Sequence, residues 1–397
     1  MDKAVSVITA RNIGSRFLAV VLLAQAPVWR VLFLMPYSLL FLLPLVISVV
    51  STPLISRFAV KNGIIDHPGA HKTHKIARPV MGGLGIYLAT VIAMAVFFPL
   101  TPGVVYIILA ASALVCTGIL DDIYDLKPLV KLAGQLIAAA LVVLGNAGRF
   151  STILSFLDDS YISMLAALLL VMAWIVLMIN AFNLIDGLDG LAAGTAVIIL
   201  CSMVAVSLVR GNLELLGYQV LVLGACAGFL PYNFQPAKIF MGDTGSMLLG
   251  FLLSVLFLYS ITEPFSVSLV LGSAFIFAYP ALDVAFAIYR RLRRGGSIFA
   301  ADQGHIHHLL IRLGFSVRQA VVTLYLLSLF FGGVSVLILC VALPSYIIFT
   351  LGAVTVIGIF FLFRFLNRLS KLPQFTYRPE KTNLPNILRD RTVTNNK

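Results

Sequence analysis

The chain has 397 residues, of which 60% are hydrophobic and only 11% are charged. So few charged side chains cannot cover the surface of a soluble protein of this size, and lipid must cover most of it. The net charge of +12 would suit nucleic acid, but in a membrane protein positive charge gathers in the loops on one side of the bilayer. We therefore expect no nucleic-acid partner.

Residues 1–30 are read as an N-terminal extension. A basic stretch precedes the apolar run 17–24, and Ala24-Gln25-Ala26 resembles a signal-peptidase site. Three alternatives stay open: cleavage of a signal-like segment, a retained extension, or a true start nearer Met35.

Beyond this extension, apolar segments long enough to cross a bilayer recur along residues 31–366. The sequence therefore predicts an all-α, polytopic integral membrane protein with one transmembrane domain and a polar, loosely ordered tail over 367–397. We count eleven transmembrane helices, near 33–55, 81–99, 103–120, 128–145, 162–181, 189–209, 215–231, 246–261, 267–289, 320–342 and 344–365.

The positive charges predict the orientation of these helices. Of the 28 Lys and Arg, 22 lie in the tail and in alternate loops, whereas the intervening loops hold only Arg149 and Arg210. Because basic loops stay in the cytoplasm, we expect the N-terminus outside and the C-terminus inside. The basic residues within 1–30 run against this rule.

The loop before the second predicted span carries a basic and glycine-containing motif. It includes Lys75 and Arg78, which would supply positive charge to a diphosphate, and it ends at Gly82-Gly83. The alternative is that these are ordinary cytoplasmic basic residues.

Asp121 and Asp122 close the third predicted span, and Asp125 follows them. At helical spacing Asp121 and Asp125 share a face, while Asp122 points about 100° away. Adjacent carboxylates repel each other, which favours a place where a divalent cation or several basic groups offset their charge. A polar helix end at the membrane boundary is the alternative.

Two further acidic motifs follow in the chain. Asn183 offers a neutral oxygen ligand, and Asp186 and Asp189 come after it, each followed by a glycine that lets a backbone approach a ligand closely. Asp243 lies between two glycines, where its carboxylate can reach a cation while backbone N–H groups face phosphate oxygens. Capping of the next helix by any of these acids is the structural alternative.

A histidine cluster, His305, His307 and His308, lies in a large predicted cytoplasmic loop. Cysteine partners with zinc-ligand spacing are absent, so imidazoles that bond to phosphate or sugar oxygens fit better than a zinc site. A surface cluster without function is the alternative. Asp283, inside the ninth span, is expected to pair with an arginine.

All these motifs fall on the predicted cytoplasmic face. A cation or sugar transporter would instead place its acids near the bilayer midplane, often at broken helices of paired repeats, and no repeat is evident. A CDP-alcohol phosphotransferase would need the motif D-G-x-x-A-R, which Asp186-Gly187-Leu188-Asp189 does not supply.

In their order along the chain, the motifs resemble those of the polyprenyl-phosphate N-acetylhexosamine-1-phosphate transferases. The resemblance runs from about Asp66 to about Arg312. The histidine pattern is closer to the N-acetylglucosaminyl-phosphate branch than to the muramoyl-pentapeptide branch, which has three consecutive histidines. The motifs that carry it are the pair Asp121-Asp122, the N-x-x-N-x-x-D-G-x-D-G stretch over 180–190, the FMGDTGS segment over 240–246 and the H-x-H-H pattern over 305–308.

The resemblance implies a role for each candidate residue. Mg²⁺, or alternatively Mn²⁺, would be held by Asp243 and Asn183. Asp121 and Asp122, together with Asp243, would serve catalysis and the lipid phosphate. The substrate-binding residues would be Lys75, Asp186, Gly187, Leu188 and Asp189 around the nucleotide, and His305, His307 and His308 around the phosphate or the sugar.

The implied reaction is transfer of N-acetylglucosamine 1-phosphate from its UDP-sugar to undecaprenyl phosphate, with release of UMP. The partners are therefore undecaprenyl phosphate, a UDP-N-acetylhexosamine and the lipid bilayer. The product would start a cell-envelope polysaccharide, such as an O-antigen or a teichoic acid, at the cytoplasmic face of the bacterial plasma membrane. UDP-GalNAc, a 6-deoxy or diacetamido sugar, a two-step route through an aspartyl phosphate, and a homo-oligomer all stay open.

Overall fold

The computed structural model describes residues 27–67, 76–154, 160–262, 266–293, 295, 304–341 and 343–369. The predictions for residues 1–26, for Lys75 and for the tail beyond 369 lie outside these residues.

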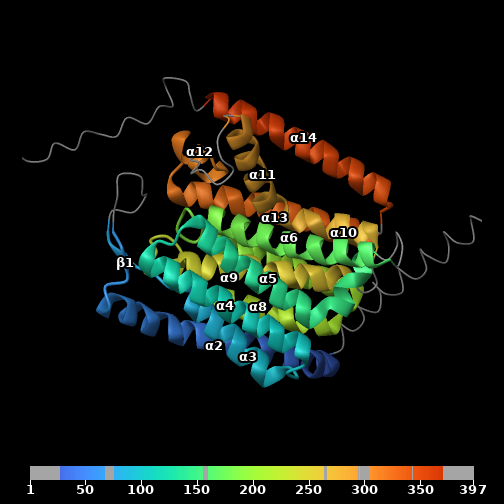
Figure 1. The fold of residues 1–397 in the computed structure, drawn as a ribbon, viewed down its shortest axis with the longest axis horizontal. Helices are drawn as coiled ribbons and strands as arrows, with labels where there is room; N and C mark the ends of the chain where they lie inside the picture. The colour runs from blue at the N-terminus through green and yellow to red at the C-terminus, as the bar shows by residue number, and fades with distance from the viewer. Residues whose placement is uncertain are drawn as a thin grey trace, which may run out of the picture.

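The described chain is a bundle of long helices with one small two-stranded sheet (Figure 1). The helices are α2 Pro27–Lys61, α3 Gly83–Phe97, α4 Pro102–Tyr124, α5 Pro128–Phe150, α6 Tyr161–Ile185, α7 Leu191–Arg210, α8 Leu213–Asn233, α9 Gly242–Thr262, α10 Val267–Ala274, α11 Ala278–Arg293, α12 Ile306–Arg312, α13 Val317–Val341 and α14 Ser345–Leu369. A short 3-10 turn at Ser151–Leu154 follows α5, and another at Phe275–Phe277 joins α10 to α11.

Among the described residues, ten helical segments are long and apolar enough to cross a membrane, with α10 and α11 counted as one. The prediction of an all-α polytopic membrane protein is confirmed. The second predicted span, 81–99, forms the 15-residue helix α3, which at 1.5 Å per residue is about 22 Å long and shorter than the hydrocarbon core. The sides on which the two termini lie stay predictions.

Helix α9 is the centre of the bundle. Every residue from Thr244 to Leu258 is buried, and the helix contacts α3 to α8 and α10. A helix that is apolar on all sides is stable only when other helices surround it. Close packing fixes its first turn, because a side chain on Gly83 of α3 or on Gly118 of α4 would overlap the α9 backbone at Gly245 and Thr244.

The small sheet holds the loop that leads into α9. Strand β1, Ile65–Asp66, pairs antiparallel with β2, Arg78–Pro79. The Phe240 N–H donates to the Pro79 carbonyl at 2.9 Å, and the Phe240 carbonyl accepts from the Gly82 N–H at 2.9 Å. The start of α9 is therefore attached to both β2 and the beginning of α3.

Helix α4 runs four residues further than its predicted span, to Tyr124. Its final turn therefore carries Asp121 and Asp122, which apolar patterning alone placed at the boundary. The turn remains helical because both carboxylates have partners outside α4, described below.

Candidate active site

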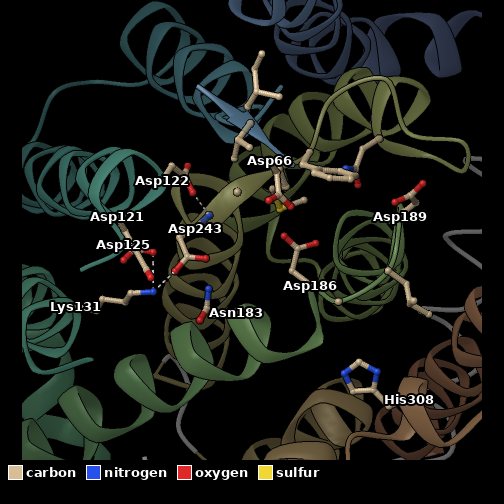
Figure 2. A pocket seen from close by; sticks show the side chains of 18 residues that line it. Asp66, Asp121, Asp122, Asp125, Lys131, Asn183, Asp186, Asp189, Asp243 and His308 are labelled. Atoms are coloured by element: carbon tan, nitrogen blue, oxygen red, sulfur yellow. Dashed lines mark hydrogen bonds and ion pairs between the residues drawn. The ribbon is translucent and has the colours of Figure 1, made fainter. Parts of the chain in front are cut away.

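A cavity of about 640 Å³ lies at the end of the bundle where α9 begins. Figure 2 shows the acidic side chains gathered around it from several helices. It is lined by Ile65, Asp66, Val80, Asp121, Asp122, Asp125, Lys131, Asn183, Asp186, Gly187, Leu188, Asp189, Asn233, Phe240, Met241, Gly242, Asp243 and His308. The structure thus brings the Asp121-Asp122, 183–189 and 240–243 motifs to one place.

Lys131, in the first turn of α5, joins two of these carboxylates. Its ammonium lies 2.6 Å from Asp121 Oδ2 and 2.7 Å from Asp243 Oδ2, and the three side chains point towards one another (Figure 2). The other Asp121 oxygen, Oδ1, accepts the Leu126 N–H at 2.9 Å. Two close carboxylates repel each other unless a cation lies between them, and the ammonium serves that purpose here.

Asp122 has a different role from its neighbour, because its carboxylate caps α9. Oδ1 accepts the Asp243 N–H at 2.8 Å, and Oδ2 accepts the Thr244 hydroxyl at 2.7 Å and the Thr244 N–H at 3.3 Å. These are N–H groups that a helix start leaves without an intrahelical partner. Gly242 has φ +72°, and a side chain there would overlap Asp122. Asp122 therefore holds Asp243 in place from another helix.

Asn183 and Asp186 come from the end of α6. The Asn183 amide donates to Ser246 Oγ at 3.0 Å, which fixes the amide beside Asp243. Asp186 follows the last helical residue, and its carboxylate faces the same cavity (Figure 2). Burial, followed by the carboxylates of Asp243, Asp122 and Asp189, raises the pKa of Asp186 to about 8. A bound cation would lower that pKa, since it favours the charged form.

The 187–190 loop is tied to the segment that precedes α9. Asp189 Oδ2 accepts the Ala237 N–H at 2.9 Å. Asn233 Oδ1 accepts the Gly190 N–H at 3.1 Å, while the Asn233 amide donates to the Ile239 carbonyl at 3.2 Å. This loop is therefore a rigid wall of the cavity, and one Asp189 oxygen is already used in holding it.

The three histidines occupy three different environments. His308 lines the cavity. His305 is buried and bonds through Nδ1 to Asp283 Oδ2 at 2.8 Å, so Asp283 pairs with a histidine rather than with the arginine we expected. His307 is also buried, and burial lowers its pKa to about 3. Only His308 of the three is placed to meet a ligand in this cavity.

The donor set fits a hard divalent cation. Carboxylate oxygens of Asp121, Asp122 and Asp243 lie within 4.8 Å of one another, and the Asn183 amide is beside them. Mg²⁺ prefers such oxygen ligands, few in number and completed by phosphate and water. The Lys131 ammonium already shows that a positive charge is accommodated between Asp121 and Asp243.

Two cavity residues escaped the sequence reasoning. By sequence Lys131 is one of the basic residues in a predicted loop, and its position ten residues after Asp121 is the signal that could point to it. Asn233 is a buried polar residue at the end of an apolar helix, and such residues in membrane proteins are functional candidates.

Comparison with known proteins identifies the family. The profile of glycosyl transferase family 4 matches residues 104–261. A probable undecaprenyl-phosphate N-acetylglucosaminyl 1-phosphate transferase of Bacillus subtilis is 37% identical, over 78% of this chain and 88% of its own length. A decaprenyl-phosphate N-acetylglucosaminephosphotransferase of Mycolicibacterium smegmatis is 34% identical, over 71% of this chain and 77% of its own length.

An undecaprenyl-phosphate alpha-N-acetylglucosaminyl 1-phosphate transferase of Escherichia coli is 31% identical, over 72% of this chain and 83% of its own length. The alignments cover most of each relative. The chain therefore belongs to glycosyl transferase family 4, in the branch of the polyprenyl-phosphate N-acetylglucosaminyl 1-phosphate transferases.

Proposed function

We propose that the protein transfers N-acetylglucosamine 1-phosphate from UDP-N-acetylglucosamine to undecaprenyl phosphate. A lipid-phosphate oxygen attacks the phosphorus that bears the sugar, the bond from that phosphorus to the UMP oxygen breaks, and UMP leaves. The observation that carries the proposal is the convergence of Asp121, Lys131, Asn183 and Asp243 on one cavity at the end of membrane-crossing helices.

Charge is the main obstacle to this reaction, because two anionic phosphates must meet. Asp243 and Asn183, with Asp121 beside them, would hold Mg²⁺, which when bound neutralises the diphosphate and stabilises the leaving UMP. Lys131 adds a second positive charge, and we assign it to the lipid phosphate, which arrives along the membrane. Mn²⁺ has the same ligand preference and is the expected substitute.

The protein groups then divide the remaining work. Asp121 accepts a proton from the lipid phosphate when that phosphate is singly protonated. The backbone of Gly187 and Leu188, with Asp189 behind them, forms the wall for the uridine, and Asp186 faces the diphosphate. His308 faces the phosphate or the sugar, and donates a hydrogen bond there.

The membrane geometry of the substrates supports a cytoplasmic site. UDP-sugars are water-soluble and cytoplasmic, whereas the polyprenyl chain stays in the bilayer. A cavity at one end of the helices can receive both. We therefore place the active site at the cytoplasmic face of the bacterial membrane, in agreement with the distribution of basic loops.

The test is release of UMP by the purified protein in detergent with undecaprenyl phosphate, Mg²⁺ and a panel of UDP-sugars. We expect UDP-GlcNAc to be preferred over UDP-GalNAc and over 6-deoxy and diacetamido sugars. Asp243→Asn should lower the rate at least about 10²-fold, because metal stabilisation of the developing charge is worth several kcal/mol.

The control is Glu214→Gln, an exposed acid at the start of α8, at the opposite end of the bundle. It should keep the wild-type rate. A full-rate Asp243→Asn protein would contradict the metal assignment, and absence of UMP release with every UDP-sugar would contradict the proposed function.

A further inference from the structure

Asp283 is a carboxylate that lies wholly inside the protein and outside the cavity lining. It is 0% exposed and belongs to α11, in the membrane-crossing segment Val267–Arg293. An ionisable residue in such a segment is costly, and it persists when it has partners and a task. The proposed reaction gives Asp283 no direct task.

Both oxygens of Asp283 are used by the segment that carries the histidines. Oδ2 lies 2.8 Å from His305 Nδ1, and Oδ1 accepts the Ile306 N–H at 2.9 Å. Ile306 is the first residue of α12, and the His305 side chain makes no capping bond of its own. Asp283 therefore satisfies the start of α12 from a different helix, which is the role of an N-cap.

Helix α12 depends on this attachment because it has only seven residues. Helices shorter than about 12 residues are marginal by themselves, so contacts with the rest of the protein must decide where they begin. The Asp283 bonds fix the first residue of α12, and thereby the direction in which its next side chains point.

The side chains of His307 and His308, which follow Ile306, lie behind Gly187 and in the cavity, respectively. His308 lines the cavity. His307 is 1% exposed, and its Nε2 lies against Gly187 so closely that a side chain on Gly187 would overlap it. The rings of His305 and His307 are parallel within 6° at 5.7 Å, and those of His307 and His308 are 4.2 Å apart. Direct contacts thus run from Asp283 to the cavity.

We propose that Asp283 is a positioning residue: through His305 and the start of α12 it places His308 in the cavity and His307 behind Gly187. The inference rests on the proposed function, in which His308 meets the sugar phosphate. Asp283 does not touch the substrate. Its contribution is geometric, and misplacement of a contacting group by about 1 Å can cost about 10²-fold in rate.

The kinetic test uses Asp283→Asn, which keeps the size of the side chain and removes its charge. We expect kcat/KM for the UDP-sugar to fall about 10-fold to 100-fold. If Asp283 acts through His308, the double variant Asp283→Asn/His308→Ala should be no more than about twofold slower than His308→Ala alone. Multiplication of the two single effects would overturn the proposal.

A second test needs no substrate. Backbone amides of residues 306–312 should exchange hydrogen for deuterium at least about tenfold faster in Asp283→Ala, which removes both acceptor oxygens, while α9 keeps its protection. Unchanged exchange in 306–312 would overturn the proposal. If the Asp283 variants do not fold, His305→Asn breaks one of the two Asp283 contacts and should give the same two results to a smaller extent.

The matched control is Ser273→Ala, a buried side chain in α10, which belongs to the same membrane-crossing segment. It should change neither kcat/KM nor exchange in 306–312. If the wild-type protein releases no UMP, the proposed function is refuted. The exchange experiment needs no substrate and still decides whether Asp283 positions α12.

Discussion

Asp121 and Asp122 are neighbours in sequence, and the structure predicts that their replacement affects stability differently. Asp122 accepts two backbone N–H groups and a hydroxyl at the start of α9. Thr244 is 0% exposed, so in Asp122→Ala its groups find no water. Loss of an N-cap costs about 0.5–2 kcal/mol, and each buried polar group left unpaired costs about 1–3 kcal/mol. We expect Asp122→Ala to destabilise the protein by about 3 kcal/mol.

Asp122→Asn retains one acceptor oxygen, so its expected cost is about half as large. Asp121→Asn should leave stability within about 1 kcal/mol, because its amide oxygen can still accept the Leu126 N–H and one of two repelling carboxylates is neutralised. Both Asp122 variants should also lose activity, since the Asp243 N–H is released from its cap.

The assay is the apparent melting temperature in detergent, measured beside UMP release. The order of stability should be wild type and Asp121→Asn together, then Asp122→Asn, then Asp122→Ala, with all three variants inactive or nearly so. An Asp122→Ala protein that melts with the wild type would refute the capping role. An Asp121→Asn protein that melts far below wild type would show that its ion pair is structural.

Three further predictions concern the charges of the site. Removing divalent cations with EDTA should abolish UMP release, and added Mg²⁺ should restore it fully; activity that survives EDTA would contradict the metal site. Lys131→Met should lower the rate at least about 10²-fold. It should also lower the Mg²⁺ concentration that gives half the maximal rate, because the ammonium no longer competes for Asp121 and Asp243. A higher Mg²⁺ requirement would contradict this competition. His307 has a pKa of about 3 in the folded chain, below its unfolded value of about 6.5, so the unfolded chain binds the proton first as pH falls. Stability should therefore fall by about 2 kcal/mol between pH 6.5 and pH 5 through this group, and His307→Gln should flatten that part of the curve of apparent melting temperature against pH.

Much of the site was accessible from sequence because a bilayer restricts where polar groups can lie. Asp121, Asn183, Asp186 and Asp243 each end or begin an apolar run, and alternation of the runs puts them on one side. Convergence in the cavity follows from that placement together with packing around α9.

The roles of individual residues within the site were much harder to read. Helical periodicity says that Asp121 and Asp122 point about 100° apart, but it does not say which faces α9. That depends on contacts with residues more than a hundred positions away, such as the Asp243 N–H that Asp122 accepts. The histidines show the same limit, because three similar side chains within four residues separate into a buried pair and one cavity residue.

At the beginning of α9, Asp243 and its partner Lys131 are held in different ways. Gly83 and Gly118 bring backbones against α9 with no room for a side chain, and Asp122 caps its first N–H groups, so Asp243 is fixed by the backbone itself. Fixed ligands suit Mg²⁺, which demands near-ideal geometry. Lys131 instead reaches the same carboxylate on a flexible stem that is 24% exposed. In the proposed reaction its ammonium would move from Asp243 to the arriving phosphate, and a divalent cation in its place would keep the carboxylates compensated.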